Sequence, residues 1–226
     1  MNAAKSSKKS PATRDPEATK SQILDAALVE FSIGGLAAAR TEAIAAQTGV
    51  TKAMIYYYFD SKEDLYRSVM DRCFRQDLQR VQQLGLQALP PQEGLVTALR
   101  LIFQTMAASP QMANILTLEA IQNKGKYYPK ETARLLYDQL IDLLERGVAS
   151  GAFREMDPRH MAINIIGSCA FYFIALENIK YLWPGKQLLG KKMLAQHAQS
   201  TMDLILAGLL TAPYVSGSVD ANVSVF

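Results

Sequence analysis

The residues best suited to contact a nucleic acid lie in one short segment, Thr51 to Phe59, which reads TKAMIYYYF. Tyrosine hydroxyls are donors for phosphate oxygens, and the small Ala53 permits close approach to a base edge or a thymine methyl group. Three adjacent tyrosines on a short helix would be a poor choice for a surface that meets only water. The segment is therefore predicted to contact double-stranded DNA.

A pair of short helices is expected to position this segment. Residues 41–48 and 51–57 have helical patterns and are separated by the tight turn Gly49-Val50, and such a pair is able to present its second helix to a major groove. Ile55 and Phe59 are spaced i, i+4 and are predicted to face inward. The residues expected to face outward or to edge the groove are Lys52, Ala53, Met54, Tyr56 and Tyr57.

Further groups flank the two helices. The helix starts at Thr41 and Thr51 offer backbone N–H groups to phosphates, and Lys62 is placed to hold the DNA backbone from the other side. Roles other than DNA contact remain possible for these residues and for the helix pair. Lys62 also fits an ordinary first-turn lysine, Tyr58 and Phe59 fit core residues, and helix pairs of this kind occur in proteins that never touch DNA.

Helical spacing continues along the rest of the chain, without a convincing strand or repeat. The sequence predicts an all-α fold of about nine helices, in which a three-helix helix-turn-helix domain precedes a helical bundle. The expected divisions are an arm (1–14), the helix-turn-helix domain (15–61), the bundle (62–212) and a flexible tail (213–226). The predicted helices are 16–33, 41–48, 51–57, 62–88, 92–108, 111–123, 129–150, 157–179 and 189–211.

Composition narrows the class of protein. The 226 residues are 49% hydrophobic and 20% charged, which suits a globular chain with a real core. The net charge of +3 resides within residues 1–20, a Ser/Lys-rich stretch that suits either a solubilising tail or an arm for polyanions. The most apolar window, 161–176, would reach about 24 Å, short of a membrane core of about 30 Å. A cytoplasmic protein without a membrane span is expected.

The sequence contains no recognisable catalytic motif. Phosphate-binding, dinucleotide-binding and nucleophile-elbow motifs are absent from the sequence, and His160 and His197 are too far apart in it to suggest a site. No Cys/His spacing fits zinc, and Cys73 and Cys169 are expected to be buried thiols rather than a disulfide. We therefore expect a protein that is not an enzyme and has no metal or cofactor.

Residues 18–70 resemble the DNA-binding region of the tetracycline-repressor (TetR/AcrR) family. The segments that carry the resemblance are Ile23-Leu24-Asp25-Ala26-Ala27, Phe31-x-x-Gly34-Gly35-Leu36, Ile44-Ala45, Gly49-Val50-Thr51-Lys52 and Ile55-Tyr56-Tyr57-Tyr58-Phe59-x-Ser61-Lys62-Glu63-x-Leu65. The resemblance implies a helical homodimer with an N-terminal DNA reader and a bundle that binds ligand and dimerises. Family DNA contacts fall on Arg40, Thr41, Thr51, Lys52, Ala53, Met54, Tyr56, Tyr57 and Lys62.

Two departures from the family pattern bear on these contacts. Ala39 and Arg40 stand where the family often has Thr or Ser, which puts the capping of the first short helix in doubt but supplies a charge for a phosphate or a guanine. Met54 replaces a frequent small residue and predicts an apolar contact. The operator sequence is therefore not inherited from the family.

The second half of the chain is expected to hold a ligand pocket. Residues 119–127 and 129–153 resemble, more loosely, a C-terminal domain of these regulators. Methionines and aromatic residues suit an adaptable apolar pocket, and polar groups inside a bundle need a hydrogen-bond partner or a ligand. The alternative is that most of them are core. The predicted lining residues are Phe103, Met106, Leu116, Glu119, Asn123, Tyr137, Asn164 and Tyr172.

A subunit interface is expected on the last two long helices. The helix over 157–180 is apolar on nearly all faces, so a second surface should cover one side of it. The final helix carries a stripe of apolar and small residues: Leu194, Ala198, Thr201, Ile205 and Gly208. Four such helices, two from each subunit, would form a symmetric interface and space two DNA readers about 34–36 Å apart.

Together these patterns predict a ligand-responsive transcriptional repressor that binds a palindromic operator as a homodimer. A small hydrophobic or aromatic effector in the bundle would tilt the long helix 62–88 and release the DNA. The alternatives are a helical adaptor that binds protein, and a DNA-binding regulator that has no small-molecule effector or acts as an activator.

Overall fold

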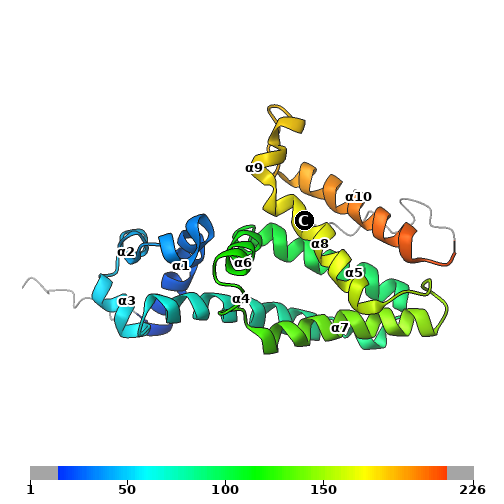
Figure 1. Ribbon diagram of the computed structural model, residues 1–226, viewed down its shortest axis with the longest axis horizontal. Helices are drawn as coiled ribbons and strands as arrows, with labels where there is room; N and C mark the ends of the chain where they lie inside the picture. Colours follow the sequence, from blue (N-terminus) through cyan, green and yellow to red (C-terminus); the bar gives the residue numbers. More distant parts are fainter. Residues whose placement is uncertain (1–14, 213–226) are drawn as a thin grey trace, which may run out of the picture.

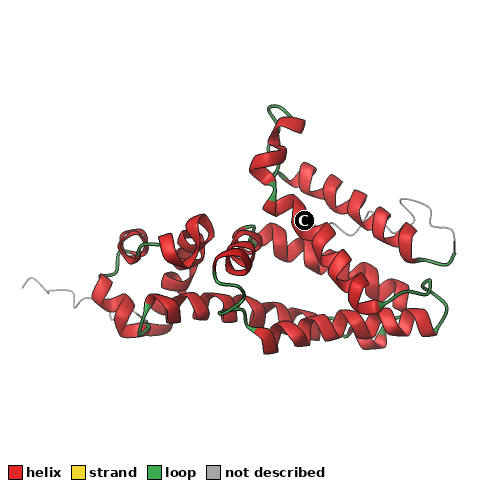
Figure 2. Cartoon of the chain, viewed as in Figure 1, coloured by secondary structure: helices red, strands yellow, loops and turns green. Residues whose placement is uncertain are grey.

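The computed structural model describes residues 15–212, and helices dominate this part of the chain (Figure 2). The predicted all-α class is confirmed, with ten α-helices in the described range. They are α1 (Pro16–Ala38), α2 (Thr41–Thr48), α3 (Lys52–Tyr58), α4 (Lys62–Gln83), α5 (Pro91–Ala108), α6 (Gln111–Gln122), α7 (Lys130–Ala149), α8 (Pro158–Ile174), α9 (Leu176–Ile179) and α10 (Lys191–Leu209). The predicted arm 1–14 and tail 213–226 lie outside the described residues.

The N-terminal helix α1 is the centre of the first core. It starts where the Asp15 carboxylate accepts a hydrogen bond from the Glu17 backbone N–H at 3.0 Å, as an N-cap does. By length and composition alone α1 could cross a membrane, but α2, α4 and α6 pack against it. Buried Ile23, Ala27 and Phe31 mark the covered face. Its apolar character is therefore explained by packing within the protein.

A glycine bends α1 near its end. The predicted stop at Gly34-Gly35 appears as a kink at Gly35, whose φ of +74° and ψ of −170° suit glycine, and one more turn follows. A Cβ at this position would collide with the amide of Gln122 on α6. The Gln122 Nε2 donates to the Gly34 carbonyl oxygen at 3.4 Å. The kink thus lies in the contact between α1 and α6.

The long helix α4 ends earlier than predicted. Its start is as expected, because the Ser61 hydroxyl accepts from the Asp64 backbone N–H at 3.0 Å. The helix stops at Gln83 instead of residue 88, since Gly85 adopts a left-handed φ of +59° and a short 3₁₀ turn, Leu86–Ala88, follows. The physical reason is the glycine, because it adopts the left-handed conformation that ends a helix at little cost in free energy.

Two hydrophobic cores share α4, which runs as one long helix from the α1–α3 end of the molecule towards the bundle (Figure 1). The N-terminal core combines α1–α3 and the first half of α4 with Ile115 of α6 and Tyr127 of the following loop. The C-terminal core is formed mainly by α5, α7, α8 and α10, with Val81 and Leu84 at the end of α4 packed against it. Residues on both sides of Lys62 therefore belong to the N-terminal core, and α4 continues from that core to the C-terminal one.

The helix predicted over 157–179 is broken. It bends by 69° after α8, and the short α9 projects away from the bundle (Figure 1). The Tyr172 hydroxyl donates to the Leu188 carbonyl oxygen at 2.9 Å, which fixes the returning chain against α8. Tyr172, Phe173, Leu188 and Leu194 form a small cluster of buried residues there. This packing accounts for the bend that the apolar pattern alone did not predict.

The prediction that the stripe on the final helix lies in a subunit interface is wrong for most of its residues. Leu194, Ala198, Thr201 and Ile205 are all buried within the chain itself, as part of the clusters that hold α10 against α5 and α8. The outer face of α10 carries Leu204, which is 69% exposed. Ala198 and Thr201 of the stripe thus serve close packing inside one subunit, whereas Gly208 is exposed with open space beside it.

Both cysteines are buried free thiols, as expected. Cys73 lies on α4 and Cys169 on α8. Burial raises the pKa of the Cys73 thiol, and raises that of Cys169 to about 12. Both therefore remain protonated at neutral pH.

Candidate nucleic-acid interface and ligand cavity

Helix α3 is held by one capping residue and two apolar anchors. Gly49 adopts a left-handed φ of +67° in the turn, and the Thr51 hydroxyl accepts from the Met54 backbone N–H at 3.1 Å. Ile55 and Phe59 are 1% and 2% exposed. The predicted inward face is confirmed, and the opposite face of α3 is turned to solvent.

Two tyrosines dominate the exposed face of α3. Tyr57 is 83% exposed and Tyr56 is 40% exposed, while Thr51, Lys52 and Ala53 are also exposed. The ring of half-buried Tyr58 meets that of Tyr57 edge-on, with centroids 5.3 Å apart. Exposed phenolic donors on a short helix form a surface that suits a phosphate-lined groove.

Lys52 already has a partner on α2. Its Nζ lies 2.5 Å from Glu42 Oε1, and both side chains are about half exposed. This hydrogen bond lowers the pKa of Glu42 and raises that of Lys52. Exposed pairs of this kind contribute little to stability, because water screens them. Lys52 can therefore exchange Glu42 for a phosphate at little cost.

The start of α2 carries two predicted contacts with different exposure. Arg40 is exposed and occupies the N-cap without a side-chain capping bond, as the sequence suggested, while its backbone N–H donates to Glu30 at 2.9 Å. Thr41 is only 4% exposed. Thr41 therefore packs inside the domain and is not exposed for contact in this structure.

Met54 and Lys62 also make contacts within the protein. Met54 is half-buried and packs against the N-terminal core. Lys62 is half-buried, and its Nζ donates to the carbonyl oxygens of Ala37 and Ala39 at 3.2 and 3.1 Å. These carbonyls lie at the C-terminal end of α1, where a cation is favoured. Lys62 thus ties α4 to α1 in this structure.

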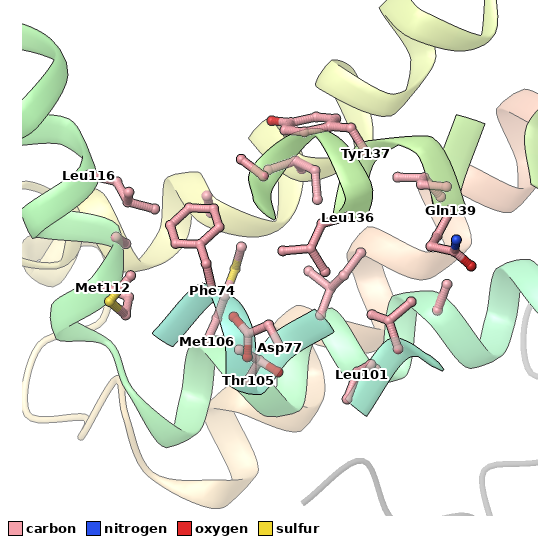
Figure 3. Close-up of a pocket in the computed structure, with 18 of the residues that line it drawn as sticks. Phe74, Asp77, Leu101, Thr105, Met106, Met112, Leu116, Leu136, Tyr137 and Gln139 are labelled. Atoms are coloured by element: carbon pink, nitrogen blue, oxygen red, sulfur yellow. The ribbon is translucent and has the colours of Figure 1, made fainter. Parts of the chain in front are cut away.

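A cavity of about 550 Å³ lies among helices α4 to α8 (Figure 3). It is bounded by residues from α4, α5, α6, α7 and α8, and most of its surface is apolar. This volume and chemistry suit a small organic ligand. The lining includes Phe74, Asp77, Leu101, Thr105, Met106, Met112, Leu116, Tyr128, Leu136, Tyr137 and Gln139.

Three of the eight predicted lining residues, Met106, Leu116 and Tyr137, line this cavity. The other five lie elsewhere. Phe103 is fully buried in the C-terminal core with its ring edge-on to His197, and Asn164 is exposed on the outside of α8. Amphipathic spacing does not distinguish a wall residue from a core residue, because both lie on the apolar side of a helix.

The side chains of Glu119, Asn123 and Tyr172 have hydrogen-bond partners within the protein. Glu119 is 1% exposed and accepts from the Tyr127 backbone N–H and from Asn123 Nδ2, each at 2.6 Å. Together with burial, this carboxylate raises the pKa of Tyr66. The polar groups that suggested a ligand therefore fasten the end of α6 to the N-terminal core, and Tyr172 fastens the loop after α9.

The sequence reasoning missed the contribution of α4 to the cavity. Asp77 lies on α4 three residues after Phe74 and four before Val81, so it shares the face of that apolar stripe. Burial raises its pKa to about 6, although Arg80 opposes this by donating to Oδ1 at 3.2 Å. A carboxylate inside an apolar stripe was the signal that could have identified it.

Helix α6 lies between the cavity and the DNA-reading domain. One face supplies Met112, Leu116 and Ala120 to the cavity lining. Another face packs against α1, with Ile115 fully buried in the N-terminal core. A change in the shape of the cavity would therefore reach α1 through a single helix.

Comparison with known proteins agrees with this architecture. A family model described as bacterial regulatory proteins, tetR family, matches residues 23–69, and one described as tetracyclin repressor-like, C-terminal domain, matches residues 91–205. The HTH-type transcriptional repressor NicS of Pseudomonas putida is 30% identical over 159 residues, which are 68% of this chain and 75% of that protein.

Solved structures with the same fold include two with bound ligands. The regulator FadR from Bacillus subtilis, in complex with stearoyl-CoA, has a TM-score of 0.65 and 23% identity, and the match covers 83% of this chain and 98% of that one. A regulator from Saccharomonospora viridis, in complex with choline, has a TM-score of 0.66 and 19% identity, covering 87% and 100%. The two family matches and the NicS relationship place this chain in the TetR family of helix-turn-helix transcriptional regulators.

Proposed function

We propose that this regulator is a repressor that binds a palindromic operator as a homodimer and is released by a small molecule in the cavity. The observation that carries the proposal is the position of α6, which forms a wall of the cavity and packs on α1 of the reading domain. An occupant of the cavity is thereby coupled to the part of the chain that would contact DNA.

In this proposal α3 enters the major groove and its exposed residues make the contacts. Tyr56, Tyr57 and Lys52 donate to phosphates, and Ala53 lets the helix approach the base edges. Arg40 adds a charge at the start of α2. Lys62 acts indirectly, by fixing α4 to the end of α1.

The exposed faces of α8 and α10 supply the subunit interface. On α8, Ile163, Phe171 and Ile174 are 59%, 64% and 41% exposed, and all three lie on one face of the helix. Leu204 of α10 adds an exposed apolar group. Large apolar side chains gathered on the outside of two neighbouring helices suit an isologous contact with a second copy.

The effector acts by preferring one arrangement of α6 and α1 over another, because a ligand shifts an equilibrium only by its difference in affinity between the two states. Stearoyl-CoA and choline, the ligands of the two structural relatives, differ greatly in size and chemistry. The fold alone therefore leaves the effector open, and the lining residues must select it.

DNA binding by the full chain tests the first half of the proposal. Fluorescence anisotropy with labelled promoter fragments should show sequence-preferring affinity that falls steeply with salt. Tyr57→Ala should weaken binding about 5- to 10-fold, since the loss of one hydrogen-bonding contact costs roughly 1–1.4 kcal/mol. Tyr181→Ala is the matched control, because Tyr181 is 73% exposed but lies far along the chain, beyond α9. A helical adaptor would bind no promoter fragment at all.

The oligomeric state tests the second half. Sedimentation of the full chain should give a dimer, and Phe171→Glu should convert it to a monomer with much weaker operator binding. Leu135→Glu is the control, as it adds the same charge at an exposed position on α7, outside both the proposed interface and the DNA-binding domain. A wild-type chain that sediments as a monomer would contradict the proposed assembly.

A further inference from the structure

The cavity contains one group whose charge is unmatched by the rest of its lining. Asp77 is the single acidic residue in the cavity wall, and the described lining residues include no lysine, arginine or histidine. Its neighbours on α4 along the same face are Phe74 and Val81, and Figure 3 draws it among apolar side chains with the hydroxyl of Thr105. An ionised carboxylate in such surroundings is costly unless a partner compensates it.

The partner that Asp77 has within the protein lies outside the cavity. Arg80 Nη1 contacts Oδ1 at 3.2 Å, and the Arg80 side chain is 48% exposed and is not part of the cavity wall. Because the pKa of Asp77 is about 6, the carboxylate is ionised at pH 7.5. The Asp77 carboxylate therefore places a negative charge in the wall of an apolar cavity, whereas its partner Arg80 lies outside that wall.

We propose that the effector is an apolar molecule that carries a positive charge, with Asp77 as its counter-ion. The inference rests on the proposed ligand-binding function and specifies its chemistry. A cation placed in the cavity meets the carboxylate directly, and the nearby rings of Phe74 and Tyr128, whose centroids are 5.4 Å apart, add cation–π attraction. An anionic ligand of the same shape would meet Asp77 without a basic residue to receive it.

A matched series of probes tests this charge preference. Decyltrimethylammonium, decanol and decanoate share one apolar chain and differ in the charge of the head group. Isothermal titration calorimetry of each with the full-length protein at pH 7.5, below the micellar concentration, should show the ammonium compound binding about tenfold more tightly than the other two. The quaternary head group is used because it has no proton to lose.

Variants on α4 locate the source of the preference. Asp77→Asn should weaken binding of the ammonium compound about tenfold and leave decanol unchanged. Asp71→Asn is the matched control, since Asp71 also lies on α4 beside an arginine, Arg75 at 4.0 Å, but does not line the cavity. It should leave the affinity of all three probes unchanged.

Several results would overturn the inference. Equal or tighter binding of decanol or decanoate, an ammonium affinity that survives Asp77→Asn, or the absence of binding by the ammonium compound would each contradict it. Operator binding by the ligand-free protein, measured separately, decides whether the proposed DNA-binding function stands. Failure of the charge preference alone leaves that function intact.

Discussion

The two hydrophobic cores of the molecule are packed in different ways. In the N-terminal core the rings of Phe31, Tyr66 and Tyr127 meet edge-to-face at centroid distances of 4.9 and 5.7 Å, and Phe31 and Tyr66 are fully buried. The C-terminal core lies beside a cavity of about 550 Å³. The comparison indicates that the N-terminal core, which supports the proposed DNA-binding helices, is tightly packed. The C-terminal part instead keeps a cavity that is large enough for a ligand.

The largest expected effect comes from opening the filled core. Phe31→Ala should lower the free energy of unfolding by about 3–5 kcal/mol, because it removes a fully buried ring and leaves a hole that its neighbours cannot close. Urea denaturation measures the loss. A change below 1 kcal/mol would mean that the N-terminal core is as loosely packed as the cavity region, and the contrast would disappear.

A smaller effect is expected where the two regions meet. Gly35→Ala should destabilise the protein by about 1–3 kcal/mol, because alanine is strained at a φ of +74° and a ψ of −170°. Its Cβ would also displace the Gln122 side chain of α6. The double variant with Gln122→Ala separates the two causes, since only the collision is relieved. Full recovery in the double variant would show that backbone strain contributes nothing.

The charge in the cavity gives a pH-dependent prediction. The pKa of Asp77 is raised to about 6 in the folded protein, above its ordinary value of 3.8, so the folded state binds the proton more tightly. Ionisation then disfavours folding as the pH rises from about 4 to 6. Asp77→Asn should raise stability by about 1 kcal/mol at pH 7.5 and have little effect at pH 4. Equal stabilisation at both pH values, in thermal melts with Asp71→Asn as control, would contradict the assigned cause.

The smallest effect is expected in the cavity wall. Leu136→Ala should cost only about 0.5 kcal/mol, since this half-buried side chain borders space that is already open. The same loss of three carbons at fully buried Leu143 should cost about 2–5 kcal/mol. If the two leucine variants lose equal stability, the wall at Leu136 is as tightly packed as the core.

Local signals in the sequence were sufficient for most of the helices and for the exposed face of α3. The Ser61 cap, the Gly49 turn and the i, i+4 spacing of Ile55 and Phe59 act over a few residues, so the pattern predicts them directly. Exposure of Thr41 and Lys62 was harder to predict. Their burial depends on where the end of α1 lies, which is a tertiary contact.

The ligand site was predicted less well for the same physical reason. Glu119 and Asn123 suggested a ligand because they are polar residues in an apolar helix, yet the loop at Tyr127 brings the N–H group that satisfies Glu119. Asp77 lies within the apolar stripe of α4, a signal that the prediction did not use. Only the packing of α4 against α5 and α7 turns it toward the cavity.

The two buried cysteines make the chain convenient for distance measurements. Protonated thiols without solvent access react slowly with maleimides and methanethiosulfonates, so Cys73 and Cys169 should stay unlabelled in the folded protein. A single engineered thiol at Tyr57→Cys would then carry the whole spin label. Pulsed electron resonance could follow the separation of two such labels while the cavity is filled and emptied.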